Sequence, residues 1–165
     1  MSLWSVLSEP ALFFLIKIYL SPSQKSRIFV VMNSRTYISD IKTKDLKRVA
    51  ELTFDWCQAN LGCKKGKTPT IKLSKKKFKV DPYYGEADGM DIVIYPHTFI
   101  EYGNCVRKFI SIIIHEYTHT LQKGGMTKYH KLYAKYGYWN HPMEIEARAS
   151  EKLWSECYRD IKGSL

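Results

Sequence analysis

The chain has 165 residues, of which 45% are hydrophobic and 25% are charged, and its formal net charge at pH 7 is +10. This length supports one hydrophobic core of ordinary size and leaves no room for two full domains, and the composition excludes a disordered protein. The positive charge is compatible with nucleic acid, an anionic membrane face or an acidic protein as partner, and it does not choose among them.

The N-terminal apolar stretch, residues 11–20, does not have the pattern of a membrane span or of a secretory signal. Lys17 interrupts it, whereas a spanning helix needs about twenty continuous apolar residues. A linker-like sequence follows from Ser21. We therefore expect no transmembrane span, an N-terminal extension over residues 1–31, and a compact domain over residues 32–165.

The four cysteines do not show the paired close spacing of a zinc knuckle or a redox dithiol. Scattered thiols favour a reducing compartment, so we expect a cytoplasmic protein. A bridge between Cys57 and Cys63 stays open at this point, because spacing alone does not exclude it. The residues are Cys57, Cys63, Cys105 and Cys157.

The first predicted elements are one helix and a small group of strands. Apolar residues recur with helical spacing from Thr43 to a stop at Asn60–Gly62. Residues 70–75 alternate between apolar and polar, as in a half-buried strand, and residues 78–80 suggest a returning strand. The strongest strand pattern is that of residues 90–95, which we place at an edge of the sheet.

Two further helices are predicted after the strands. Asn104 is a suitable N-cap for a helix over residues 105–123 that would end at Gly124–Gly125. Apolar residues occupy almost every face of this helix, so it should be buried. A last helix should begin near Asn140–Pro142 and run to about Asp160.

The buried helix contains the sequence His115-Glu-Tyr-Thr-His119. Two histidines four residues apart stand on one face of a helix, about one turn from each other, which is the arrangement that grips a zinc ion. Glu116 lies beside the pair, where its carboxylate can take a proton from a water on the metal and act as a general base. The motif predicts a zinc-dependent hydrolase.

The third metal ligand is less clear from the residues alone. A metzincin would have a third histidine six residues after His119, but that stretch reads Thr-Leu-Gln-Lys-Gly-Gly. The remaining candidates are His130, His141, Glu144 and Glu146.

The motif and the later sequence Asn140-His-Pro-Met-Glu-Ile-Glu-Ala147 together resemble the small gluzincin-type metallopeptidases of bacteria and phages. In that group, a Glu-x-x-Ala pattern on the following helix completes the metal site, which implies that Glu144 is the third ligand. The resemblance covers residues 104–160. The chain departs from the group's pattern at one position: the residue after the Ala is often Asp in the group, and here it is Arg148. Arg148 lies one turn beyond Glu144, where it could orient the Glu144 carboxylate.

A second resemblance is to the SprT-like proteases, which use a third histidine and act on proteins attached to DNA. It rests on the stretch from Gly124 to Tyr133, which contains His130. The loop is shorter than that group usually has, and Glu144 would then have no role. In either group an oxyanion donor is needed, and Tyr136, Tyr138 and His141 are the candidates near the last helix.

These resemblances imply an α+β, zincin-like fold for residues 32–165, in which a small twisted sheet packs on the active-site helix and the C-terminal helix supplies the third ligand. We expect a monomeric zinc peptidase that acts on peptides or proteins. A different class is also open. Eight lysines lie between Lys64 and Lys79 without an acidic residue among them, which suits a non-catalytic, zinc-stabilised module that binds nucleic acid.

Overall fold

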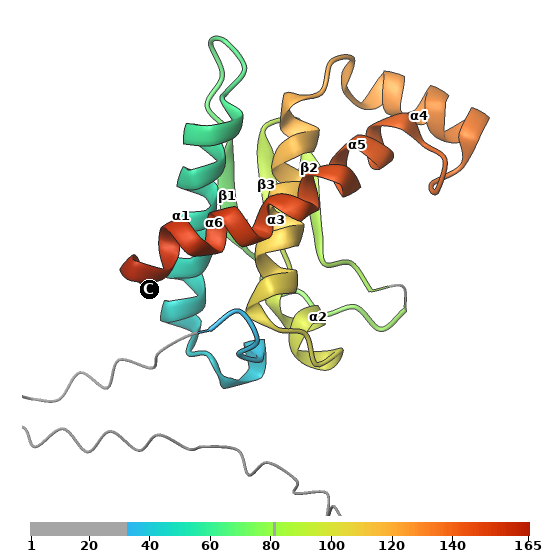
Figure 1. Ribbon diagram of the computed structural model, residues 1–165. Coiled ribbons are helices and arrows are strands. Elements are labelled where there is room, and N and C mark those ends of the chain that lie inside the picture. The colour runs from blue at the N-terminus through green and yellow to red at the C-terminus, as the bar shows by residue number, and fades with distance from the viewer. Residues whose placement is uncertain (1–32, 81) are drawn as a thin grey trace, which may run out of the picture. The chain divides into compact units, whose positions relative to one another are not determined.

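The computed structural model describes residues 33–80 and 82–165, so the predicted extension over residues 1–31 lies outside it. The described part is α+β, with a small sheet and a larger number of helices (Figure 1). In chain order the main elements are α1 (Thr43–Leu61), β1 (Thr70–Leu73), β2 (Gly85–Asp88), β3 (Asp91–Ile94), α2 (Pro96–Glu101), α3 (Val106–Leu121), α4 (Gly125–Tyr136), α5 (Pro142–Ser150) and α6 (Trp154–Ile161).

The sheet has three strands in the order β1-β3-β2. β1 runs parallel to β3, with Thr70 opposite Asp91, and β2 runs antiparallel to β3, with Gly85 opposite Ile94. The predicted strand over residues 70–75 is confirmed as β1. The placement of residues 90–95 at an edge was wrong: β3 is the central strand and β2 is an edge, because the segment before the Asp88–Gly89 turn folds back on β3.

Residues 78–80 do not form the predicted strand. The Phe78 ring instead packs edge-on against Tyr95, with centroids 4.8 Å apart, while Val80 is 77% exposed. This aromatic contact holds the loop against the end of β3 without any ladder hydrogen bonds.

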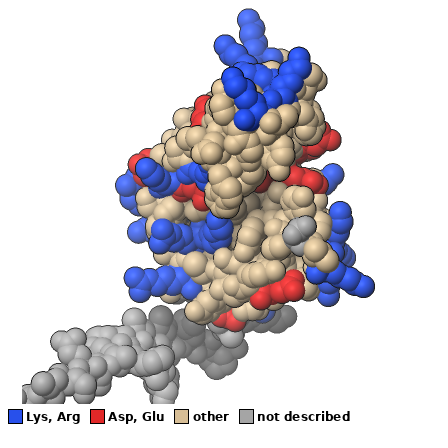
Figure 2. Space-filling view, turned by 90° about the vertical axis from the view of Figure 1, so that its right-hand side faces the viewer, with Lys and Arg blue, Asp and Glu red and all other residues tan. Residues whose placement is uncertain are grey.

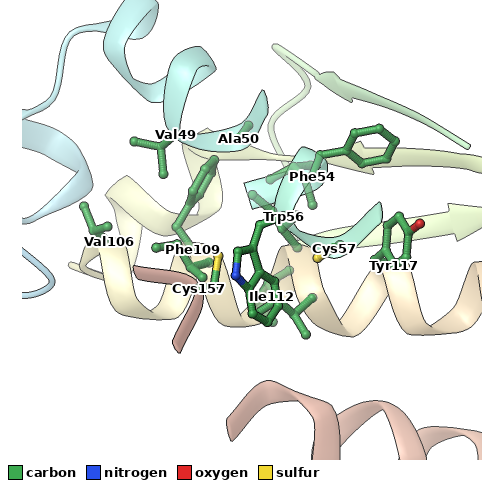
Figure 3. Close-up of a cluster of buried hydrophobic side chains, with 14 of the residues drawn as sticks. Val49, Ala50, Phe54, Trp56, Cys57, Val106, Phe109, Ile112, Tyr117 and Cys157 are labelled. Carbon is green, nitrogen blue, oxygen red and sulfur yellow. The ribbon is translucent and has the colours of Figure 1, made fainter. Parts of the chain in front are cut away.

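The core lies between the sheet and helices α1, α3 and α6. α1 and α3 pack side by side, and α6 crosses both of them (Figure 1). Figure 3 shows how side chains from these helices meet, with Phe109 and Tyr117 of α3 facing Val49 and Phe54 of α1. The Trp56 indole also donates a hydrogen bond of 2.9 Å to Asp160, which ties α1 to α6.

The predicted bounds of α3 need two corrections. Asn104 is not its N-cap; its side chain donates to the Tyr84 hydroxyl, and the backbone N–H groups of Val106 and Arg107 are bound by the carbonyl oxygens of Thr36 and Ser34. The helix also ends at Leu121, before the two glycines, because Gln122 is already extended.

The region after α3 contains more helices than predicted. Gly124, in the left-handed region at φ 111°, precedes α4, a helix that the sequence analysis missed. The last predicted helix begins at Pro142 as expected, but a 3-10 turn over Glu151–Leu153 separates α5 from α6. The apolar periodicity of α4 is similar to that of α1, but the helix begins at the second of two glycines that indicate a helix end, so no helix was predicted there.

Gly85 determines how closely β2 approaches α3. A methyl group at this position would lie 2.9 Å from Ile94 Cδ1 and 3.0 Å from Glu116 Cγ. Those distances are shorter than ordinary van der Waals contact, so only glycine allows the strand to pass this part of the helix without displacing its neighbours.

Replacing Gly85 with Ala should therefore lower the free energy of unfolding by about 1–3 kcal/mol, because the added methyl group overpacks the β2–α3 contact. Urea unfolding followed by circular dichroism measures the change. Gly163→Ala is the matched control, since a methyl group there meets nothing within 4 Å, and it should stay within about 0.5 kcal/mol of the wild type. Equal stabilities of the two variants would contradict the packing argument.

Candidate metal site

Two helices bring His115, His119 and Glu144 together. The histidines lie on α3 and point the same way, with their Nε2 atoms 3.2 Å apart. Glu144, on α5, lies with Oε2 3.4 Å from His115 Nε2 and Oε1 3.4 Å from His119 Nε2. These three residues form a compact group of possible metal ligands.

The spacing of these donor atoms fits a tetrahedral ion. Two bonds of about 2.1 Å at a tetrahedral angle place their donor atoms about 3.4 Å apart, and the observed separations are 3.2 and 3.4 Å. Glu144 is 3% exposed, and its Oε2 atom has no hydrogen-bond partner. A buried carboxylate oxygen without a donor is costly unless a cation faces it, so the group can hold a divalent ion.

The Nδ1 atom of each histidine faces a side-chain oxygen that can accept its proton in a hydrogen bond. His115 Nδ1 lies 2.9 Å from Glu151 Oε1, and His119 Nδ1 lies 2.8 Å from Gln122 Oε1. An oxygen acceptor at Nδ1 places the proton there and leaves the Nε2 lone pair free to face a metal. Gln122 is itself fixed, because its amide donates to the Met143 carbonyl and to Glu146.

Glu116 lies next to the metal-ligand group but is not part of it. Its side chain is 8% exposed and borders the same cleft as the two histidines. Burial raises the pKa of Glu116 to about 7, although the two imidazoles act in the opposite direction. The position predicted for a general base is therefore one that a substrate in the cleft can reach.

The charges in this group favour cations. Burial alone would lower the pKa of His115, but the nearby Glu144 carboxylate and the hydrogen bond with Glu151 outweigh it and raise the pKa to about 9. Burial likewise opposes ionisation of Glu144, but the imidazoles of His115 and His119, which face it, and the hydrogen bond from Tyr129 hold its pKa well below the usual range. A site that attracts protons in this way also attracts a metal ion, which competes for the same atoms.

Tyr129, on α4, is a site residue that the sequence analysis missed. Its hydroxyl donates a hydrogen bond of 2.7 Å to Glu144 Oε1. Nothing in the local sequence pointed to it, because α4 was not predicted and the contact joins two helices. Glu151 was missed for the same reason, because its contact with His115 depends on the path of the chain around α3. Gln122 lies three residues after His119, and this helical spacing is the signal that could have indicated it.

The other predicted ligands do not join the group. His130 is exposed on α4 and contacts the Tyr129 ring. His141 is fully buried, but its Nδ1 accepts from the Met143 N–H and its Nε2 bonds the Tyr129 carbonyl, so it caps α5 and holds α4. Glu146 is exposed and accepts from Gln122.

The predicted supporting residues are only partly in place. Arg148 does not bond the Glu144 carboxylate; it donates to the Trp139 carbonyl at 2.6 Å and lies against the Tyr138 ring. Of the candidate oxyanion donors, Tyr138 lines the cleft and Tyr136 does not.

A cleft of about 680 Å³ opens over the group. β2 forms one wall, with Glu86 and Asp88, and α4 with the start of α5 forms another. Lys64 and Lys67 line it as well. On the face in Figure 2, basic side chains form separate groups around a largely uncharged surface, so positive charge does not cover this face evenly.

Comparison with protein-family models, with curated proteins and with solved structures found no match for this chain. Within residues 33–80 and 82–165, no helix is long and apolar enough to cross a membrane. The four cysteines are free thiols, so Cys57 and Cys63 are not bridged.

Replacing Glu151 with Ala should weaken zinc binding about 10- to 100-fold, because His115 would lose the acceptor that fixes its ring and raises its basicity. Competition with a zinc chelator of known affinity measures the dissociation constant. Glu156→Ala, an exposed position on α6, removes the same charge away from the site and should bind zinc like the wild type. Equal affinities in the two variants would remove Glu151 from the metal site.

Proposed function

We propose that the chain is a zinc-dependent peptidase with a zincin-like fold and a gluzincin-type ligand set. The observation that supports this most is the pairing of a three-donor group, His115, His119 and Glu144, with a separate carboxylate, Glu116, in one cleft. Structural zinc sites have four protein ligands, whereas catalytic sites have three and keep a position open. Two histidines and one glutamate are one of the ligand sets that catalytic zinc sites use.

In this proposal His115, His119 and Glu144 hold the zinc ion. When bound, the ion polarises the substrate carbonyl and makes a nearby water more acidic. Glu116 accepts the proton of the attacking water and returns it to the leaving amine, so it serves as base and then as acid. Tyr138 lines the cleft, where its hydroxyl can donate to the oxygen that gains negative charge.

The substrate would bind along β2. Among the described residues this strand pairs with β3 only, and Gly85–Asp88 line the cleft. An extended peptide can add to such an edge through main-chain hydrogen bonds, which place a carbonyl group over the site with little demand on sequence. Gly85, against Glu116, sets the distance from that edge to the proposed base.

Two alternatives make different demands on the residues. A SprT-like site would need His130 as a ligand, but His130 lies outside the donor group, so the geometry favours Glu144. A zinc-stabilised nucleic-acid-binding module would need the metal ligands and the lysines but would have no use for Glu116.

The test is hydrolysis by the zinc-loaded chain and by its Glu116→Gln variant. A fluorescently labelled unfolded protein and a mixed peptide library serve as substrates, and fragments are identified by mass spectrometry. Glu116→Gln should lower kcat/KM by about 10²–10⁴-fold, the usual contribution of a general base, while zinc content stays the same. Glu51→Gln, an exposed position on α1, is the control and should keep full activity.

Two results would contradict the proposal. One is a wild-type chain that holds zinc but cleaves nothing in the library. The other is cleavage that persists unchanged in Glu116→Gln, which would show that the activity comes from another residue or from a contaminant.

A further inference from the structure

One end of the cleft is formed by a turn in the loop between α1 and β1. The Lys67 N–H bonds the Lys64 carbonyl at 3.2 Å, and Gly66 between them has φ 76°, which glycine adopts without strain. Both lysines line the cleft, whereas Lys65, between them, does not. The turn therefore directs two of its three lysines toward the substrate space.

Lys64 is held close to the metal-ligand group. Its ammonium donates a hydrogen bond of 2.7 Å to the Gln122 carbonyl, and the Gln122 side chain bonds His119. Met90 fixes the other end of the loop, because its carbonyl accepts from the Thr70 N–H at 2.9 Å. Gln122, which holds the His119 ring, therefore also holds the Lys64 ammonium at the cleft.

Neither Lys64 nor Lys67 forms an ion pair within the part of the chain that the structure describes. Four acidic residues also line the cleft: Glu116 and Glu144 belong to the proposed metal site and its base, and Glu86 and Asp88 lie on β2, which forms a different wall. Glu86 already accepts a hydrogen bond from the Tyr95 hydroxyl. The two ammonium groups are therefore unneutralised positive charges, and their other N–H donors are free for a ligand.

We propose that the cleft selects peptides with a carboxylate at the end lined by Lys64 and Lys67, either an Asp or Glu side chain or a free C-terminus. This inference rests on the proposed peptidase function and adds the substrate class to it. An acidic group on the substrate forms charge-assisted hydrogen bonds with the two ammonium groups.

Binding to the zinc-loaded Glu116→Gln chain tests this without turnover. Three labelled peptides share one otherwise uncharged sequence: one has a central Glu and an amidated C-terminus, one has Gln and a free C-terminus, and one has Gln and an amidated C-terminus. Fluorescence anisotropy should show that at least one carboxylate peptide binds about tenfold more tightly than the neutral one, as expected for one or two partly exposed charge pairs. The peptide that binds more tightly shows whether the cleft recognises an acidic side chain or a free C-terminus.

The same measurements are made after adding Lys67→Glu or Lys65→Glu. These variants change the net charge equally, but only Lys67 lines the cleft. Lys67→Glu should abolish the preference and Lys65→Glu should keep it. A carboxylate that bound only the metal ion would show no such difference between the variants.

Equal binding of the three peptides, or equal loss of preference in both variants, would overturn the inference. The peptidase function is judged separately, from hydrolysis by the chain with Glu116 intact. Cleavage without a carboxylate preference would support the peptidase function and contradict this inference. A carboxylate preference that depends on Lys67, without any cleavage by the chain with Glu116 intact, would support this inference and contradict the peptidase function.

Discussion

The Glu144 carboxylate is buried between α3 and α5, with an imidazole 3.4 Å from each of its oxygens and with no hydrogen-bond donor to Oε2. Burying a charged carboxylate costs free energy unless donors or a cation offset the lost hydration. His115, His119 and Tyr129 supply part of that compensation. The packing of α5 on α3 depends on this balance, because Glu144 lies where the two helices meet, one turn before Ala147, which is fully buried.

Several other features follow from this contact. After α5 the chain turns back toward α3 through the 3-10 turn at Glu151–Leu153. This turn places the Glu151 carboxylate against His115 Nδ1. On the opposite side Gly85 allows β2 to lie against Glu116. The proposed base, the proposed ligands and the strand edge thus share one cleft, although they come from three elements: α3, α5 and β2.

The sequence alone predicted the parts of the site that are local. His115, Glu116 and His119 lie within five residues, and helix geometry places both histidines on one face whatever surrounds them. Glu144 was identified by resemblance, and the structure brings it to the histidines. Glu151 and Tyr129 could not be predicted, because each acts across a contact between elements. Gln122 lies only three residues after His119, so its contact is local and was within reach of the sequence.

The same distinction explains the results for the fold. Helices α1 and α3 have long periodic patterns and were predicted, as was the α+β class. The order of the strands was not, because β2, Gly-Glu-Ala-Asp, has little strand propensity and forms only by pairing with β3. α4 was not predicted although its apolar periodicity is similar to that of α1, because two glycines that indicate a helix end stand at its start.

The central claim is that His115, His119 and Glu144 bind one zinc ion. Elemental analysis of purified wild type, Glu144→Ala and His130→Ala, after zinc is offered and the excess is dialysed away at neutral pH, tests it most directly. The account predicts one zinc per chain in the wild type and in His130→Ala, and loss of zinc in Glu144→Ala. Zinc retained without Glu144 but lost without His130, or no zinc in the wild type, would contradict it.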